Sequence, residues 1–374
     1  MSNENLHKAN LAKNDEFYTQ LTDIEKELNH YKEQLKGKIV YCNCDDPAWS
    51  NFVRYFIMQF NNIGLKGLIA TGYVQGSGAL TNQLNLVDMM QGKTEEDLKT
   101  QRDLSTSYYI DIKSVSRTMT NYFIENANRN LSNYDLLKFL KKESLIKTLK
   151  GDGDFRSAEC MHLLKRCDVV ITNPPFSLFR EYISQLMEYN KQFLIIGNKN
   201  AITYKDVFVH IKNNKLWLGY NNVKTFINNK FSEQHFGNVG WYTNLEVSKR
   251  NEPLVLYKKY YNTEEDKHNP NYVNPEYPKY DNYDAIEVSR VADIPVDYDG
   301  VMGVPITFLD KYTPRQFEIE KFRKGNDDKD LTYTEKVDVS EEKASNTKKF
   351  NTHTHTTRKI QPYFRILIRR CRNR

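Results

Sequence analysis

The sequence lacks the features of a membrane-spanning or exported protein. Among its 374 residues, no run approaches the ~18 consecutive apolar residues that a membrane span needs, and residues 1–16 are mostly polar. The five cysteines have no C-x-x-C spacing, which favours neither a disulfide framework nor a zinc site. His353 and His355 lack a partnered Cys or acidic residue, so we predict no metal site. We therefore expect a cytoplasmic protein without a membrane partner.

The chain also lacks a strong overall charge. A net charge of +6 at this length is common among proteins that never contact nucleic acid. Positive charge is nevertheless concentrated in residues 358–374, which contain several arginines and no acidic residue. Such a segment suits contact with phosphates, but a solvated, frayed terminus explains it equally well. Both interpretations stay open from the sequence.

Periodicity predicts that the folded chain begins with a helix and a βαβ unit. Apolar residues recur at helical spacing between Asp23 and Leu35. Residues 38–42 form an apolar run of strand length that ends at a turn rich in Asp and Pro. Ser50 is placed to cap a second helix, and residues 65–70 form the next apolar run. This order is typical of the start of a parallel sheet.

Further strand patterns extend this α/β core past an insertion. Residues 75–150 are polar and mostly helical in pattern, with no obvious strand. Continuous apolar runs return at 168–172 and 192–196, as in strands that are buried on both faces. Three strand-like segments then suit an antiparallel edge added to a mostly parallel sheet: 215–218, 240–245 and 254–257.

The sequence predicts a second lobe after the core. Residues 262–284 are dense in Asn, Pro, Tyr and acidic residues, which favours a surface connection over a regular helix. We therefore expect a catalytic domain over residues 1–260, including the insertion, and a C-terminal lobe over 261–374. The lobe is expected to be small and loop-rich, with short apolar patches at 301–309, 317–322 and 363–368.

A rare tetrapeptide, Asn173-Pro174-Pro175-Phe176, follows directly on the apolar run at 168–172. It therefore stands at the carboxyl edge of the predicted sheet, where ligands bind in folds of this class. An Asn oxygen and a carbonyl held by stiff prolines can accept hydrogen bonds from a planar amino group and aim its lone pair at a methyl donor. Phe176 can stack on a base extruded from its duplex. The alternative is a proline-rich turn with a core Phe.

Acidic turns supply candidates for a cofactor site. The carboxylates of Asp45-Asp46-Pro47 suit the charged amino acid end of S-adenosylmethionine, although glycines are absent from this loop. A simple turn followed by a helix cap is the alternative. Asp154-Phe155, within an acidic turn, can hydrogen-bond and stack on an adenine ring, or can form an ordinary surface turn. Residues 14–19 combine acids, two aromatic rings and a hydroxyl, and suit either a pocket wall or a hydrophobic staple.

Four segments together resemble the EcoRI-type family of adenine-specific DNA methyltransferases. They are residues 15–19, Asp45-Asp46-Pro47, residues 151–157 and Asn173-Pro174-Pro175-Phe176, and residues 301–309 in the second lobe resemble the family as well. The resemblance implies a Rossmann-like methyltransferase core with S-adenosylmethionine as the cofactor. It also implies double-stranded DNA as the partner and methyl transfer to the N6 amino group of a flipped adenine.

The resemblance assigns roles to individual residues. The catalytic residues are expected to be Asn173, Pro174, Pro175 and Phe176. Phe17, Tyr18 and Thr19 match the family's cofactor-binding element, and Asp46 and Pro47 match its loop after the first strand. Together with Asp45, Asp154 and Phe155 of the acidic turns, these are the expected cofactor-binding residues. Two features depart from the usual pattern: the loop after the first strand has no glycines, and no acidic residue follows residues 68–70.

Alternative functions keep the tetrapeptide and change the acceptor. Cytosine N4, an RNA adenine and a protein glutamine amide all present a planar amino group. A catalytically silent DNA-binding subunit is a further alternative, although it would be expected to have lost the intact Asn173. A cognate restriction endonuclease acting on the same DNA site is compatible with the sequence, without a stable complex between the two proteins.

Overall fold

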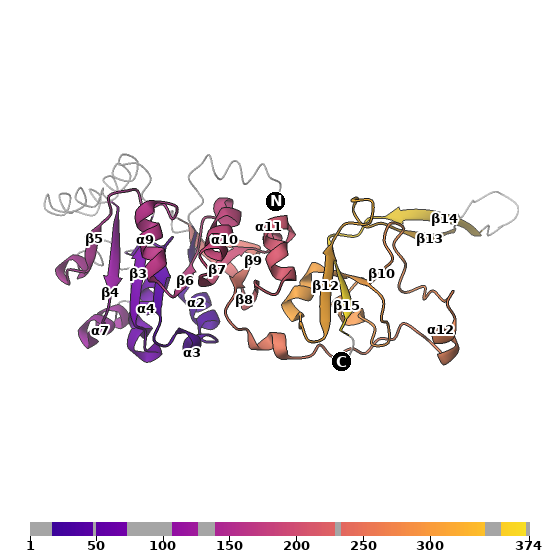
Figure 1. Cartoon of the computed structure of the whole chain (residues 1–374), viewed down its shortest axis with the longest axis horizontal. Helices are drawn as coiled ribbons and strands as arrows, with labels where there is room; N and C mark the ends of the chain where they lie inside the picture. The colour runs from indigo at the N-terminus through magenta and orange to yellow at the C-terminus, as the bar shows by residue number, and fades with distance from the viewer. Residues whose placement is uncertain are drawn as a thin grey trace, which may run out of the picture. The chain divides into compact units, whose positions relative to one another are not determined.

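The computed structural model of the chain describes residues 17–47, 50–72, 107–125, 139–228, 233–340 and 353–371. The chain divides into two units. Unit 1 takes residues 1–207 and 216–246, and unit 2 takes residues 208–215 and 247–374 (Figure 1). Within the described ranges, no helix is long and apolar enough to cross a membrane.

Unit 1 is built on a large mixed sheet that has nine strands among the described residues. In spatial order the strands are β1 (Phe17–Thr19), β8 (Trp217–Asn228), β9 (Glu233–Thr243), β7 (Gln192–Asn198), β6 (Val169–Thr172), β2 (Ile39–Cys42), β3 (Gly67–Thr71), β4 (Tyr108–Ile112) and β5 (Ile146–Thr148). The four central strands β7, β6, β2 and β3 are parallel, and the strands beyond them pair antiparallel. This arrangement confirms the predicted α/β class with a mixed sheet.

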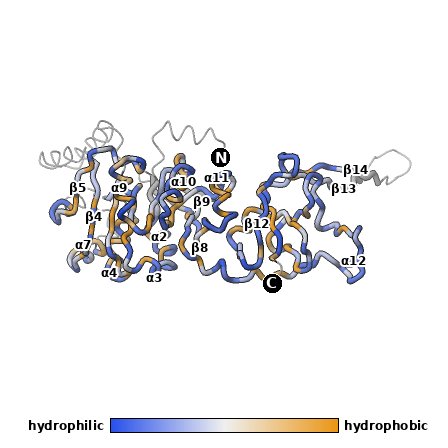
Figure 2. Tube along the Cα trace, viewed as in Figure 1, coloured by the Kyte–Doolittle hydropathy of each residue, from blue (hydrophilic) through white to orange (hydrophobic). Residues whose placement is uncertain are grey.

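Helices connect these strands. They are α2 (Leu21–Leu28), α3 (Lys32–Leu35), α4 (Asn51–Ile63), α7 (Arg117–Glu125), α9 (Ala158–Arg166), α10 (Phe179–Glu188) and α11 (Lys205–Lys212), with short 3-10 turns η1 (Phe176–Leu178) and η2 (Lys199–Thr203). As predicted, Ser50 caps α4, because its side chain accepts a hydrogen bond from the Phe52 N–H. Gly64 ends the same helix in a left-handed conformation. Figure 2 shows hydrophobic residues along the central strands and α4.

The order of the central strands defines where a ligand can bind. From β2 the chain crosses through α4 to β3 on one side, and from β6 it crosses through α10 to β7 on the other. The direction of progress along the sheet therefore reverses between β2 and β6. In open α/β sheets, the connections at such a reversal diverge and leave a crevice at the carboxyl ends of the strands.

Glu27 of α2 fastens the first helix to β8. Its side chain is fully buried and accepts hydrogen bonds from the backbone N–H groups of Tyr220 (2.7 Å) and Asn221 (2.8 Å). These two amides lie where the pairing of β8 with β9 shifts register, so the carboxylate satisfies donors at an interruption of the ladder. The Tyr31 hydroxyl also donates to Glu27 (3.0 Å), and burial together with this charge raises the pKa of Tyr31.

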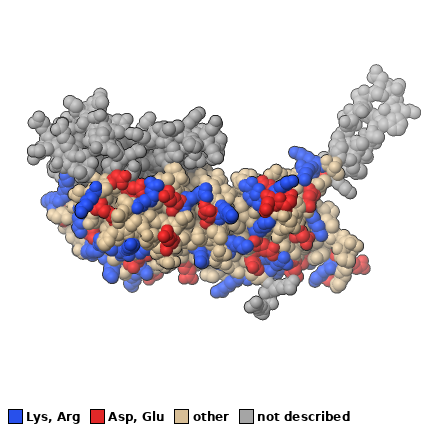
Figure 3. Space-filling view, turned by 45° about the horizontal axis from the view of Figure 1, so that its top comes forward, with Lys and Arg blue, Asp and Glu red and all other residues tan. Residues whose placement is uncertain are grey.

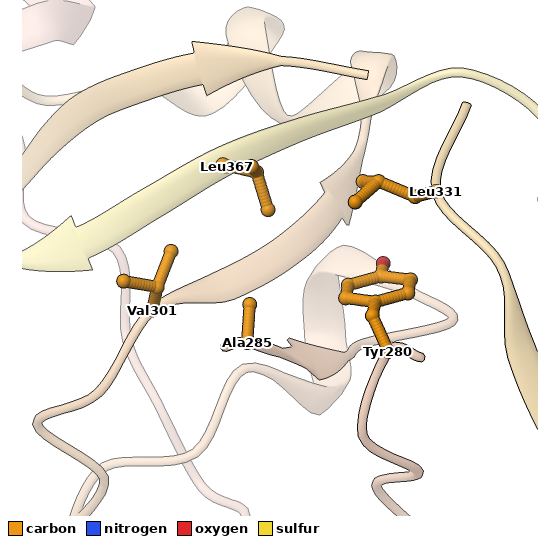
Figure 4. Close-up of a cluster of buried hydrophobic side chains, with 5 residues drawn as sticks. All are labelled: Tyr280, Ala285, Val301, Leu331 and Leu367. Carbon is orange, nitrogen blue, oxygen red and sulfur yellow. The ribbon is translucent and has the colours of Figure 1, made fainter. Parts of the chain in front are cut away.

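Unit 2 contains two separate sheets among its described residues. The first, in spatial order, is β10 (Ile286–Glu287), β11 (Met302–Pro305), β15 (Arg365–Arg370) and β12 (Phe317–Phe322). The second is a ribbon of β13 (Tyr333–Ser340) and β14 (His353–Ile360). Unit 2 also contains the helical segments η3 (Ser248–Asn251), α12 (Glu264–His268), η4 (Val291–Asp293) and η5 (Ile306–Lys311). Figure 4 shows a buried cluster in this unit: Tyr280, Ala285, Val301, Leu331 and Leu367.

Several local predictions were wrong. The helix expected over residues 23–35 is interrupted between Leu28 and Lys32, so α2 and α3 are separate. The region 75–150, expected to contain no strand, supplies β4 and β5 to the sheet. In β4 buried and half-buried residues alternate, a weaker signal than a continuous apolar run. Residues 254–257 are not a strand, and the side chains of Val255 and Tyr257 are 64% and 81% exposed.

The basic C-terminal segment is not a frayed tail over its described residues. β15 lies between β11 and β12, and its residues 366–368 are fully buried. Arg365 donates to the buried Glu287 carboxylate (2.6 Å), and Arg369 donates to Glu320 (2.6 Å). These two arginines therefore stabilise unit 2 through ion pairs, and the interpretation as a solvated tail was wrong for them.

We predict that Glu27→Gln destabilises the protein by about 3 kcal/mol, because an amide offers one acceptor oxygen where backbone donors approach both carboxylate oxygens. Urea unfolding followed by circular dichroism measures the effect. Glu25→Gln on the same helix is the control, since Glu25 is exposed. Equal unfolding midpoints for the two variants would contradict the role assigned to Glu27.

Candidate active site

The Asp45 carboxylate lies at the centre of the crevice edge. It is 7% exposed and accepts hydrogen bonds from the Ser50 hydroxyl (2.7 Å) and the Thr172 hydroxyl. The backbone N–H of Asn173 faces the same carboxylate and lowers its pKa. Thr172 in turn accepts from the backbone N–H of Cys44 (3.1 Å). The loop after β2, the cap of α4 and the end of β6 are therefore joined through one carboxylate.

Burial dominates the electrostatics of this carboxylate. Removing the charged form from water raises the pKa of Asp45 to about 6, although the donors from Thr172, Ser50 and Asn173 act in the opposite direction. The neighbouring Asp46 charge raises the pKa further. A titratable group with a pKa near neutrality thus lies within the candidate site, as is frequent at functional sites.

Asp46 and Pro47 continue this loop towards β3 and β4. The Tyr108 hydroxyl of β4 donates to Asp46 (2.7 Å), while Pro47 is buried. At the end of β3, a Cβ added to Gly72 would lie 2.8 Å from the Asp46 Cα, which no side chain tolerates. Gly72 therefore permits the close approach of two loops at the carboxyl edge, as glycine commonly does.

The tetrapeptide Asn173-Pro174-Pro175-Phe176 directly follows β6 at the same edge. Pro174 is buried, and the other three residues are half-buried. The Phe176 ring meets the Phe226 ring of β8 edge to face, with centroids 6.3 Å apart. The motif therefore has a fixed backbone and a partly exposed aromatic ring beside the crevice.

The helix that follows the tetrapeptide is pressed against β7. A Cβ added to Gly197 would lie 2.3 Å from an atom of the Phe179 ring. Glycine at this position therefore lets Phe179, the first residue of α10, pack flat on the strand. This packing holds α10 close to β7 and so supports the position of the motif before it.

The N-terminal element reaches the same site by pairing with β8. Phe17, Tyr18 and Thr19 form β1, and Thr19 pairs with Phe226. The Thr19 carbonyl accepts a hydrogen bond from the Asn51 side chain (2.8 Å) in the first turn of α4. Thr19 Oγ1 is buried and has no hydrogen-bond partner among the described residues. A buried hydroxyl of this kind can bind a ligand group.

The acidic turn at 151–155 lies near the loop after β2, through Tyr182. Phe155 is buried and meets the Tyr182 ring edge to face, with centroids 5.0 Å apart. The Tyr182 hydroxyl donates to Asn43 Oδ1 in that loop. Asp154 is engaged by Arg156 (2.7 Å), whose hydrogen bonds hold the pKa of Asp154 below its usual range. Asp154 is therefore already paired with a cation, whereas Phe155 forms part of the wall.

Tertiary contacts bring the predicted segments together at one edge of the sheet, and they add residues that the sequence did not indicate. These are Asn43, Gly72, Tyr108 and Thr172. The bond between Tyr108 and Asp46 joins residues 62 positions apart, and no local pattern marks such a pair. Thr172 had a weak signal, since it is the polar residue that directly precedes Asn173. Within the described parts of the chain, no cluster of His, Cys, Asp and Glu could hold a metal ion.

Comparison with known proteins identifies the family. The family described as "Adenine-specific methyltransferase EcoRI" matches residues 5–371. The chain belongs to this family. It is similar to the Type II methyltransferase M.EcoRI of Escherichia coli, with 41% identity over 99% of this chain and 98% of that protein. It is also similar to the Type II methyltransferases M.MgeORF184P of Mycoplasma genitalium and M.MpnI of Mycoplasma pneumoniae, each 33% identical over 84% of both chains. No solved structure matches.

Family membership confirms the resemblance drawn from the four sequence segments, and it selects among the acceptors. This member of the EcoRI-type family is an adenine-specific DNA methyltransferase. Cytosine N4 and a protein glutamine amide are therefore not the acceptors. Family membership does not by itself assign roles to individual site residues.

We predict that Asp45→Asn alters the pH dependence of stability. Burial raises the folded pKa of Asp45 to about 6 from an ordinary 3.8, so folding favours the protonated form. Its contribution to stability is complete below pH 3.8 and is lost as the pH rises through about 6. The unfolding free energy of the wild type, relative to the variant, should fall by about 3 kcal/mol over this window.

Urea titrations at a series of pH values measure this difference. Asp152→Asn is the control, because Asp152 is exposed. If the difference between the wild type and Asp45→Asn did not change with pH, Asp45 would have an ordinary pKa in the folded protein and the description of its burial would be wrong.

Proposed function

We propose that this protein transfers the methyl group of S-adenosylmethionine to the N6 amino group of an adenine extruded from double-stranded DNA. The observation that carries the proposal is the hydrogen bond to the Asp45 carboxylate from the hydroxyl of Thr172, the residue directly before Asn173. It joins the expected acceptor motif to the expected cofactor loop across the reversal in strand order. Both halves of a methyl transfer site are thereby held at one edge of the sheet.

The residues at this edge fit the cofactor. Thr19 Oγ1 and Asn43 Nδ2 are buried polar atoms without a hydrogen-bond partner among the described residues, and a bound ligand can satisfy them. The half-buried Asp46 supplies negative charge for an ammonium group. Phe155 supplies an aromatic wall. When bound, S-adenosylmethionine supplies an electrophilic methyl group.

Asp45 has a different role in this proposal from that of Asp46. Its carboxylate is buried and accepts hydrogen bonds from the hydroxyls of Ser50 and Thr172. It therefore positions the two loops and is not expected to contact the cofactor. This assignment narrows the initial prediction, which gave both Asp45 and Asp46 a cofactor-binding role.

The tetrapeptide is suited to act on the amine. The Asn173 side-chain oxygen and the Pro174 carbonyl can both accept hydrogen bonds from the N6 amino group. They would hold its lone pair out of the purine ring, in the direction of the methyl donor. Two prolines restrict the backbone that carries these acceptors, and Phe176 offers a ring for stacking on the extruded base.

The remaining features support a finer description. The reversal of strand order supports a Rossmann-like methyltransferase core within residues 1–260. Residues 261–374 would then form the lobe that contacts DNA. The names of the three relatives, all Type II methyltransferases, support a cognate restriction endonuclease that acts on the same DNA site. Nothing in this proposal requires a stable complex with that endonuclease.

We predict that Asn173→Ala reduces methyl transfer at least about 100-fold, because one preorganised acceptor for the amine is lost. Sequencing host DNA for modified adenines after expression of the wild type and the variant reads both activity and target site. Binding of S-adenosylmethionine, measured by calorimetry, should be nearly unchanged. Asn213→Ala is the control, since Asn213 is exposed. Methylation by Asn173→Ala at the wild-type level would exclude the assigned role.

We also predict that the target base leaves the duplex. 2-Aminopurine placed at the target adenine should brighten on binding, because extrusion removes the neighbouring bases that quench it. The same probe placed several base pairs away is the control and should stay dim. An unchanged signal at the target position throughout a saturating titration would count against extrusion.

A further inference from the structure

The β13–β14 ribbon of unit 2 is a two-stranded element without a third strand. Its strands pair with each other from Tyr333 and Ile360 to Ser340 and His353, and no other strand in the described chain joins their sheet. Figure 1 shows the ribbon extending from the rest of unit 2. A lone two-stranded ribbon is marginally stable in water, whereas the major groove of DNA has the width to admit one.

The base of this ribbon is firmly anchored. Leu331, just before β13, belongs to the buried cluster of Figure 4, and Tyr333 packs against Tyr280 of the same cluster. The Tyr280 hydroxyl donates to the buried Glu287 carboxylate, which also binds Arg365. We call residues 357–364, which are the end of β14 and the segment that follows it, the ribbon root. The root is therefore held at both ends: Ile360 pairs with the packed Tyr333, and Arg365 directly after the root forms the buried ion pair.

Unpaired positive charge is present at the ribbon root. Arg358 and Lys359 are exposed, and neither has an ion-pair partner among the residues that the structure describes. By contrast, Arg323, Arg365 and Arg369 are paired with acidic residues. Figure 3 shows basic and acidic side chains interspersed over the described surface. Arg358 and Lys359 are consecutive in β14 and so lie on opposite faces of the ribbon, with Arg358 across from the exposed Glu335 of β13. Both cations are exposed and available to phosphates.

An exposed aromatic side chain lies beside these cations. Tyr363 is 63% exposed and its ring lies tilted against that of Phe364, with ring centroids 4.7 Å apart. The Arg323 guanidinium lies over the Phe364 ring, 4.3 Å from its centroid. These side chains line a pocket of about 390 Å³. Aromatic rings combined with arginine form stacking platforms for nucleobases in many nucleic-acid-binding proteins.

We infer that the ribbon root is a DNA-contact surface, which carries the β13–β14 ribbon into the major groove of the substrate duplex. Arg358 and Lys359 neutralise backbone phosphates, and the Tyr363 ring packs against the nucleotide that borders the pocket. The inference rests on the proposed function, because it takes double-stranded DNA as the substrate. It assigns the phosphate contacts of the C-terminal segment to Arg358 and Lys359, because Arg365 and Arg369 are already in ion pairs.

The salt dependence of DNA binding tests the charged part of this surface. Each phosphate contact contributes about 0.9 to the slope of log K against log salt, so Arg358→Ala combined with Lys359→Ala should flatten the slope by about 2 units. Affinity should fall alike for a duplex with the target site and for an unrelated duplex. The control combines Lys311→Ala with Arg315→Ala, since both residues are exposed in the same unit. The control should leave the slope unchanged.

Tyr363→Ala tests the aromatic part. It should weaken DNA binding roughly 5- to 100-fold, in the range found for loss of one stacked base, while Tyr363→Phe should bind as the wild type does. Tyr257→Ala is the matched control, because Tyr257 is even more exposed in the same unit. It should bind DNA normally.

The outcomes separate this inference from the proposed function. If the wild type methylates adenine in DNA but the Arg358 and Lys359 variant keeps the wild-type slope, the ribbon root is not a contact surface. Equal changes in that variant and in the Lys311 and Arg315 control would also overturn the inference, since they would reveal only a general charge effect. If the wild type methylates no DNA, the proposed function itself fails. Should the double Ala variant misfold, Arg358→Gln with Lys359→Gln removes the same charges and retains polar side chains.

Discussion

The candidate site depends on one buried carboxylate. Asp45 joins the loop after β2 to the end of β6, because its oxygens accept hydrogen bonds from Ser50 and Thr172 and face the Asn173 amide. Taking a carboxylate out of water is costly unless donors surround it, so these three groups hardly move without exposing an unsatisfied charge. The cap of α4 and the backbone of the acceptor motif are thereby coupled. A shift of the loop after β2 therefore affects the position of Asn173.

A second buried carboxylate has a similar task at a distance from the crevice. Glu27 satisfies backbone amides of β8 where its pairing with β9 is interrupted. β8 carries Phe226, which pairs with Thr19 and contacts Phe176. The position of β8 therefore affects both the N-terminal element and the acceptor motif. In each case an acidic side chain compensates for a backbone that leaves regular pairing.

The two units use charge in different ways. At the crevice of unit 1, buried acids are satisfied by neutral donors, which keeps the loops in place. In unit 2, Arg365 and Arg369 of the C-terminal segment form ion pairs with Glu287 and Glu320. The exposed cations at Arg358 and Lys359 therefore stand out despite the modest net charge. A count of basic residues in the sequence does not distinguish the paired Arg365 and Arg369 from the exposed Arg358 and Lys359.

The sequence by itself determined the class of fold, the family and the place of the Asn-Pro-Pro-Phe tetrapeptide after its strand, because each depends on a local pattern. Continuous apolar runs predicted β2, β3, β6 and β7, and the tetrapeptide follows its strand without a gap. Only the tertiary structure decided which groups meet. Thr172 and Asp45 are 127 positions apart, and Arg365 and Glu287 are 78 apart. Such contacts depend on strand order and register, which a periodicity of two or 3.6 residues does not encode. The placement of β15 inside its sheet was missed for the same reason, whereas β4 was missed because its alternation of buried and half-buried residues is a weaker signal than a continuous apolar run.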